Sequence, residues 1–209
     1  MTCAGCHDCP FVNGEGAVDH HEIHITVETR NVALFKVLCE DAGVKPIVIE
    51  FQTSLQDTDT HVMTSYQMKG TDEAAMAKAK EIAKWLAATG FKVIRTKIEP
   101  TIRGDRDYSK GYFESHLAFR LQTHQQQALG RILKKASPTA RLSRNAFKKD
   151  GDSIVLMATV RHRDCTPAAF KAEMERVVKY MADYCFPSER LIIEYCWYDS
   201  AESVDNAWV

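Results

Sequence analysis

Polar and apolar residues alternate along residues 20–28, HHEIHITVE, so that Ile23 and Ile25 fall on one side and Glu22 and His24 on the other. A period of two residues is typical of a β-strand with one buried face. Residues 112–120, YFESHLAFR, show the same alternation. The chain therefore places Glu-x-His twice on the polar side of a predicted strand.

The segments around the first of these strands predict a complete unit. Thr71 can cap a helix that ends at Gly90, with an apolar stripe of Met76, Ala79, Ala83 and Leu86. The first half of the chain thus has the order β-α-β-β-α-β, with strands at 20–28, 45–52, 61–68 and 91–99 and helices at 31–43 and 71–90.

The second half repeats this order. Thr166 and Pro167 begin its last helix as cap and first helical residue. Its strands fall at 112–121, 140–147, 153–163 and 190–198 and its helices at 123–137 and 166–185. We therefore predict an α+β fold built by tandem duplication of a ferredoxin-like βαββαβ unit, whose two antiparallel sheets form a pseudo-symmetric cleft or an α+β barrel. The predicted divisions are a cysteine-rich tail 1–18, units 19–100 and 112–199, a joint 101–111 and an acidic tail 200–209.

Charge and composition add few constraints. The net charge is −1, but residues 101–149 hold eleven Lys or Arg against three Asp or Glu. This basic bias favours an anionic partner, such as a small anionic ligand or a nucleotide or RNA end, or it is simply a solvated face. No apolar run is long enough for a membrane span, and the N-terminus resembles no secretory signal. We therefore expect a cytoplasmic protein with reduced cysteines and no membrane partner.

Each unit should stack its helices on one sheet face and leave the other face open. Two open faces in one chain can cover each other, which would bring His24 and His116 to a shared interior. Side chains two residues apart on a strand lie on the same face, so a glutamate accompanies each histidine. The expected polar lining also includes Glu22, Glu114, Glu194, Arg95, Lys97, Arg161 and Ser65 or Thr159.

The four residues His24-Ile25-Thr26-Val27 and, less completely, His116-Leu117-Ala118-Phe119 resemble the motif of the two-histidine phosphoesterases. The resemblance covers these eight residues and the two-lobed layout. It implies cofactor-free hydrolysis of a small phosphodiester or of a nucleotide or RNA end. His24 and His116 would then exchange protons with water and the leaving oxygen. Thr26 would hold a phosphate oxygen, and Glu22, Glu114, Arg95, Lys97 and Arg161 would contact the substrate.

Two alternatives remain open for the same residues. One is an α+β barrel that holds a small ligand, heme or a divalent ion such as Zn²⁺, with His20, Glu22 and His24 as metal ligands on one strand face. The other is a binding or assembly module without catalysis, in which the histidines are structural. The sequence does not predict the oligomeric state.

The N-terminus carries a separate candidate. Cys3, Cys6, His7 and Cys9 offer four possible ligands to a zinc or iron ion, and CAGCH also matches a heme-attachment pattern. The alternative is a flexible, reduced tail.

Overall fold

The computed structural model describes residues 19–52, 58–104, 106–145 and 153–202. The first half contains β1 (His20–Glu28), α1 (Val32–Asp41), β2 (Lys45–Gln52), β3 (Thr58–Lys69), α2 (Asp72–Ala88) and β4 (Lys92–Pro100). The second half contains β5 (Tyr112–Gln122), a 3-10 turn (Thr123–Gln125), α3 (Gln126–Ala136), β6 (Arg141–Asn145), β7 (Ser153–His162), α4 (Pro167–Asp183) and β8 (Arg190–Cys196), followed by the short β9 (Tyr198–Asp199). The predicted order of strands and helices is confirmed in both halves.

The two long helices begin at the predicted caps. The Thr71 hydroxyl accepts a hydrogen bond from the Ala74 N–H at 3.3 Å. The Thr166 hydroxyl accepts one from Ala169 at 3.1 Å, ahead of Pro167 at the start of α4. A short polar side chain satisfies an N–H group that has no partner inside the helix, which is why these residues fix the start.

The buried stripe of α2 differs from the predicted one by a small rotation. Ala75, Ala79, Ile82 and Leu86 are buried, whereas Met76 and Ala83, both named in the prediction, lie at the edge of the core. A helix lined with alanines offers several nearly equivalent faces, and the larger Ile82 decides which one turns to the sheet.

The strand order is the same in the two halves. In the first it is β2-β3-β1-β4 and in the second β6-β7-β5-β8, with every pairing antiparallel. The first strand of each half is therefore central, as predicted, with the third and fourth strands on its two sides. The described residues form an α+β fold with one large antiparallel sheet and four helices.

The predicted division into two sheets is wrong, because β2 and β6 pair with each other. Their contact aligns Ile49 with Asn145, Glu50 with Arg144 and Phe51 with Ser143. Both are edge strands of their halves, and an edge strand carries unpaired backbone groups that another edge can satisfy. The tandem duplication itself stays a prediction.

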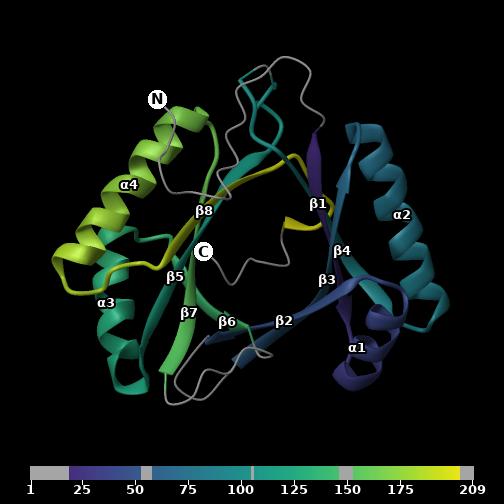
Figure 1. Ribbon diagram of the computed structural model, residues 1–209, viewed down its shortest axis with the longest axis horizontal. Coiled ribbons are helices and arrows are strands. Elements are labelled where there is room, and N and C mark those ends of the chain that lie inside the picture. Colours follow the sequence, from purple (N-terminus) through teal and green to yellow (C-terminus); the bar gives the residue numbers. More distant parts are fainter. Residues whose placement is uncertain (1–18, 53–57, 105, 146–152, 203–209) are drawn as a thin grey trace.

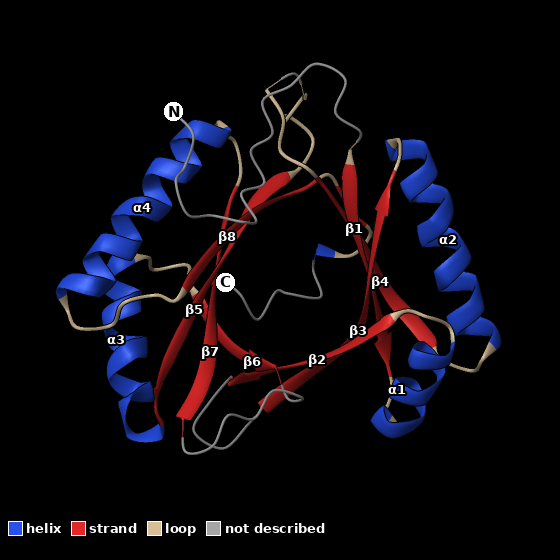
Figure 2. Cartoon of the chain, in the orientation of Figure 1, coloured by secondary structure: helices blue, strands red, loops and turns tan. Residues whose placement is uncertain are grey.

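The last strand closes the sheet into a ring on the side opposite the β2–β6 pairing. β8 pairs with β5, and its continuation β9 pairs with β4 of the first half. Between them the Trp197 N–H donates to the Ile98 carbonyl at 3.0 Å. The strands therefore surround a common interior, with α1 and α2 outside one half and α3 and α4 outside the other (Figures 1 and 2).

Two hydrophobic cores lie under the two helix pairs. One is built around Phe35, Ile23 and Ile25, and the other around Phe113, Leu117 and Phe170. These apolar positions alternate with the Glu-x-His residues, so the latter face the interior of the ring. Within the described ranges no helix has the length and apolar character needed to cross a membrane. A cytoplasmic location stays a prediction.

Candidate functional site

The two halves place a second glutamate opposite each Glu-x-His pair. Glu22 on β1 lies across from Glu99 on β4, and Glu114 on β5 lies across from Glu194 on β8. Because the side chains of opposed residues share a sheet face, each histidine has carboxylates on its own strand and on the neighbouring one. The result is two equivalent Glu–His–Glu clusters.

His24 is fixed by the backbone as well as by the carboxylates. Its Nδ1 donates to the Thr64 carbonyl at 3.0 Å, and its Nε2 lies 3.1 Å from Glu99 and 3.5 Å from Glu22. The Thr64 hydroxyl meanwhile accepts the Ile25 N–H at 3.1 Å. A ring with a carbonyl at one nitrogen and a carboxylate at the other donates from both, which is the protonated form.

Electrostatics agree with this assignment. Burial alone would lower the pKa of His24, but the hydrogen bond and charge of Glu99, together with the charge of Glu22, raise it to about 9. The same cause acts on His116, whose Nε2 lies 3.1 Å from Glu194 and whose Nδ1 lies 3.0 Å from the Thr159 hydroxyl. Glu194 and Glu114 outweigh burial and raise the pKa of His116.

Lys97 joins the two clusters. Its Nζ lies 2.6 Å from Glu99 of the first half and 2.6 Å from Glu114 of the second half. Burial disfavours the charged forms of Lys97, Glu99 and Glu114. The attraction of the two carboxylates nevertheless raises the pKa of Lys97 well above its usual value. Lys97 and Arg161 in turn hold the pKa of Glu114 well below its usual value. A buried ion network therefore runs across the interface between the halves.

The remaining predicted site residues are placed around this network. Arg161 lies 3.3 Å from Glu114. Arg95 donates to Asp199 at 2.9 Å and to the Tyr112 hydroxyl at 3.2 Å, so it serves the closure of the ring. Thr26 is buried beside a β-bulge. The predicted polar lining, Glu22, His24, Lys97, Glu114, His116 and Arg161, is thus brought together.

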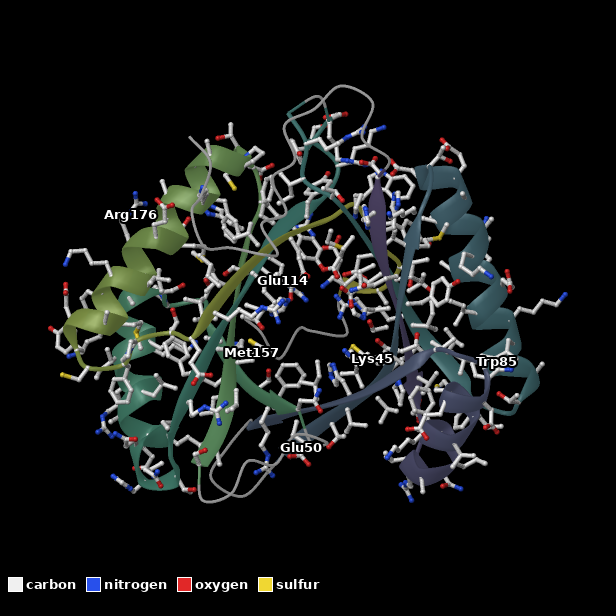
Figure 3. The ribbon with its side chains drawn as sticks, in the orientation of Figure 1. Lys45, Glu50, Trp85, Glu114, Met157 and Arg176 are labelled. Atoms are coloured by element: carbon white, nitrogen blue, oxygen red, sulfur yellow. The ribbon has the colours of Figure 1, made fainter. Side chains whose placement is uncertain are left out.

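The apolar part of the interior was not predicted from the sequence. Met63 lies two residues before Ser65, Met157 lies two residues before Thr159, and Ile192 is paired with His116, so all three face inward. Ile47 pairs with Met63 and continues this surface. These side chains belong to neither helix-covered core and are partly exposed. Figure 3 shows Met157 and Glu114 on the inner side of the strands, away from the helices.

Glu99 was also missed, although a signal for it existed. Its counterpart Glu194 was expected in the lining from the fourth strand of the second half. Matching the two fourth strands residue by residue would have placed Glu99 in the same position. The apolar surface had no comparable signal, because Met63 and Met157 also fit an ordinary core.

The predicted metal ligands His20, Glu22 and His24 are not the group that the fold assembles. In the described ranges, the group of imidazole and carboxylate side chains close enough to share an ion is Asp19, His21 and Asp72. Asp19 and Asp72 line an open hollow of about 640 Å³ beside the joint, whereas the His21 side chain is buried. Arg106 donates to Asp19 at 2.7 Å and to Asp72 at 2.8 Å, and Arg103 lies 3.0 Å from Asp19, so two guanidiniums already balance the two carboxylates. Cys3, Cys6, His7 and Cys9 lie outside the described residues.

No family model and no curated protein matches the sequence. Among solved structures, the chain is similar to a "putative monooxygenase" from Fusobacterium nucleatum, with 10% identity, a TM-score of 0.30 and coverage of 87% of this chain and 92% of that chain. It is similar to a heme-binding protein from Thermus thermophilus, with 8% identity, a TM-score of 0.31 and coverage of 86% and 92%. It is also similar to chlorite dismutase from Candidatus Nitrospira defluvii, with 12% identity, a TM-score of 0.27 and coverage of 90% and 93%.

The phosphoesterase interpretation, with a nucleotide or RNA end as substrate, is wrong. The geometry of the two histidines gives the physical reason. A general base needs a nitrogen that is free to take a proton, whereas the ring nitrogens of His24 and His116 already face protein oxygens, and neighbouring carboxylates raise the pKa of both rings. The expectation that no cofactor is needed belonged to that mechanism and is corrected with it.

Proposed function

We propose that the protein binds a small amphipathic ligand inside the ring of strands. The observation that carries this proposal is a single inner surface with both characters. Met63, Met157 and Ile192 supply an apolar side, and the Glu–His–Glu clusters supply a polar side. Small-molecule sites are commonly apolar surfaces with a few fixed polar groups that orient the ligand.

The polar groups suit recognition better than catalysis. Neighbouring carboxylates raise the pKa of His24 and of His116, and the side chains of the two residues are 15% and 23% exposed. Their ring positions are fixed by Thr64 and Thr159 before any ligand arrives. Polar groups that are held in place before binding lower the ordering cost of binding a polar head group.

Heme is a ligand named for one of the similar structures, but His24 and His116 do not fit heme iron. An axial imidazole needs an unprotonated nitrogen that faces the metal. Both ring nitrogens of His24 and of His116 face carbonyl, hydroxyl or carboxylate oxygens. The proposed function therefore assigns no iron to His24 or His116.

We also infer that the two halves arose by tandem duplication. The equivalence extends from Glu22 and Glu114 to the opposing Glu99 and Glu194, which occupy the same register in the two sheets. This inference explains why one interior carries two copies of the cluster.

The fluorescent anion 8-anilinonaphthalene-1-sulfonate (ANS) tests the proposal, because it combines an aromatic body with a charged head. We expect saturable binding with one site per chain. The variant Met157→Glu places a carboxylate in the apolar surface and should weaken binding at least about tenfold, or about 1.4 kcal/mol.

The matched control is Val37→Glu, because Val37 lies on α1 with 54% of its surface exposed. It adds the same charge outside the ring and should leave ANS binding unchanged. Near-UV circular dichroism of each variant checks that the fold is retained. Absence of saturable binding in the wild-type protein, or equal effects of the two substitutions, would overturn the proposal.

A further inference from the structure

The helices on the outside of the ring differ in how their charged side chains are arranged. Three of them pair a lysine with a carboxylate three or four residues later, namely Lys36 with Glu40 on α1, Lys78 with Glu81 on α2, and Lys171 with Glu175 on α4. α3, by contrast, holds three cations and no acidic residue: Arg131, Lys134 and Lys135. Among the helices of the described residues, α3 alone therefore has no ion pair of its own.

The equivalent helix of the first half shows that the fold does not require this positive charge. α1 and α3 each lie between the first and second strands of their halves and outside the ring (Figure 1). α1 carries Lys36 against Glu40 and Asp41, which sum to −1. The three cations of α3 sum to +3. The basic character is thus a property of α3 and not of its place in the fold.

Arg141, the first residue of β6, extends the positive charge beyond the helix. Burial and the charge of Arg141 lower the pKa of Lys134, so these two cations influence each other. The Lys134 Nζ donates to the Pro138 carbonyl at 2.8 Å. In the described part of the chain, no carboxylate pairs with the four cations that we call the basic patch, Arg131, Lys134, Lys135 and Arg141.

The arrangement of the basic patch opposes folding unless an anion is bound. Arg131 and Lys135 are four residues apart and therefore neighbours on the helix surface, where like charges repel. The helix dipole favours the cations of the last turn, Lys134 and Lys135. It does not account for Arg131 in the preceding turn or for Arg141 on β6. A polyanion across the patch would remove the repulsion.

The exposed face of α3 also indicates the kind of polyanion. Among the described residues, the exposed large apolar side chains all lie outside α3, at Leu34, Val37, Tyr184 and Tyr198. Protein interfaces and membrane-bound helices need apolar or aromatic anchors, and single-stranded nucleic acids bind by stacking on aromatic rings. Contacts to the phosphates of a duplex need only cations and polar donors. Gln127 on α3 and Thr139 just before β6 are exposed and can add such donors.

We propose that α3 and the start of β6 bind the phosphate backbone of a double-stranded nucleic acid through the basic patch. α3 has 11 residues and spans about 16 Å, whereas duplex DNA carries one negative charge per about 1.7 Å of its axis. Several phosphates therefore lie within reach of the helix. Contacts of this kind hold a protein on a duplex without reading its base sequence. The surface is separate from the ligand site proposed inside the ring.

Fluorescence anisotropy of a short labelled duplex at a series of salt concentrations tests the proposal. Four phosphate contacts predict that the logarithm of the binding constant falls against the logarithm of salt concentration with a slope of about −3.6. The double variant Arg131→Gln/Lys135→Gln removes two of these contacts. We expect its slope to be about −1.8 and its affinity at low salt to fall at least about tenfold.

The matched control is Lys36→Gln/Lys78→Gln. It removes the same total charge from lysines that are already paired with Glu40 and Glu81 on the helices of the first half. It should leave the slope and the affinity unchanged. Arg131→Lys keeps the charge of the patch and should keep the slope of the wild-type protein. Circular dichroism checks that each variant retains the fold.

Every outcome decides for or against the basic patch. Binding of DNA or RNA duplexes with the expected slope supports the proposal, and the two duplexes compared at one sequence show which is preferred. The proposal is overturned if the wild-type protein binds neither duplex at low salt, or if the two double variants lose equal affinity. Tighter binding of a single strand, a polyglutamate peptide or vesicles containing phosphatidylserine would also overturn it, because the patch would then serve another partner.

Discussion

At the scale of single residues, His24 shows how a strand position becomes a fixed positive charge. The alternation around Glu22 and His24 predicts which face of the sheet the His24 imidazole occupies. It does not predict protonation, which depends on the Thr64 carbonyl and on Glu99, residues that are distant in sequence. These partners could be found only from the register of β3 and β4 against β1.

The raised pKa of His24 makes the free energy of unfolding depend on pH. The folded value is about 9 and the usual value about 6.5. Protonation therefore stabilises the fold fully below about pH 6.5, and this contribution is lost as the pH rises through 9. We expect a decrease of about 3 kcal/mol across this range. Urea unfolding at a series of pH values measures it.

His24→Gln should remove most of this slope. His162→Gln is the matched control, because His162 is exposed at the end of β7 and contacts Glu173. A titration of the His24 ring by NMR with a midpoint near 6.5 would contradict the assignment.

At the scale of elements, β4 connects the halves through one side chain. Lys97 is buried between Glu99 and Glu114, and its equivalent on β8 is the apolar Ile192. The second half therefore shows that this strand position accepts an apolar residue when no carboxylates need a partner. Loss of the Lys97 cation would leave the buried carboxylates of Glu99 and Glu114 without their shared partner.

Lys97→Ile should consequently destabilise the protein by roughly 3–5 kcal/mol, as is typical when one partner of a buried ion pair is removed. Chemical unfolding monitored by tryptophan fluorescence provides the measurement.

Lys92→Ile on the same strand is the control. Lys92 pairs with Glu28 at the surface, and such pairs contribute about 0–1 kcal/mol. Equal effects of the two substitutions would show that Lys97 is not a buried link.

The sequence predicted the elements well, since β1, β2 and the caps of α2 and α4 follow from local patterns. The inner faces of β1 and β5 were also predictable, because alternation fixes which residues share a side. The pairing of β2 with β6 was not, because residues 140–147 carry a weak strand pattern and nothing local specifies a partner. Glu99 and Met157 entered the site only through such distant contacts.

At the scale of the whole molecule, the ring depends on how its last strand is held. Asp199 accepts hydrogen bonds from Arg95 on β4 and from Tyr112 on β5, so one carboxylate secures both sides of the closure. Asp199→Asn keeps the size and removes the charge. We expect faster hydrogen exchange in residues 92–100 and unchanged exchange in β7, because β9 would pair less firmly with β4.

Hydrogen exchange followed by mass spectrometry measures this difference. Asp183→Asn is the control, since Asp183 lies at the end of α4 and pairs with Lys179 at the surface. Unchanged exchange in β4 of the Asp199 variant would show that the ring closes without this carboxylate.

The most direct test of the ligand-binding interior uses NMR of methionine methyl groups during ANS titration. Met63 and Met157 face the interior, whereas Met174 and Met181 lie in the core under α4. We expect the Met63 and Met157 methyl signals to shift in proportion to bound ANS while those of Met174 and Met181 stay in place. Saturable ANS binding that leaves Met63 and Met157 unshifted would contradict a ligand site inside the ring.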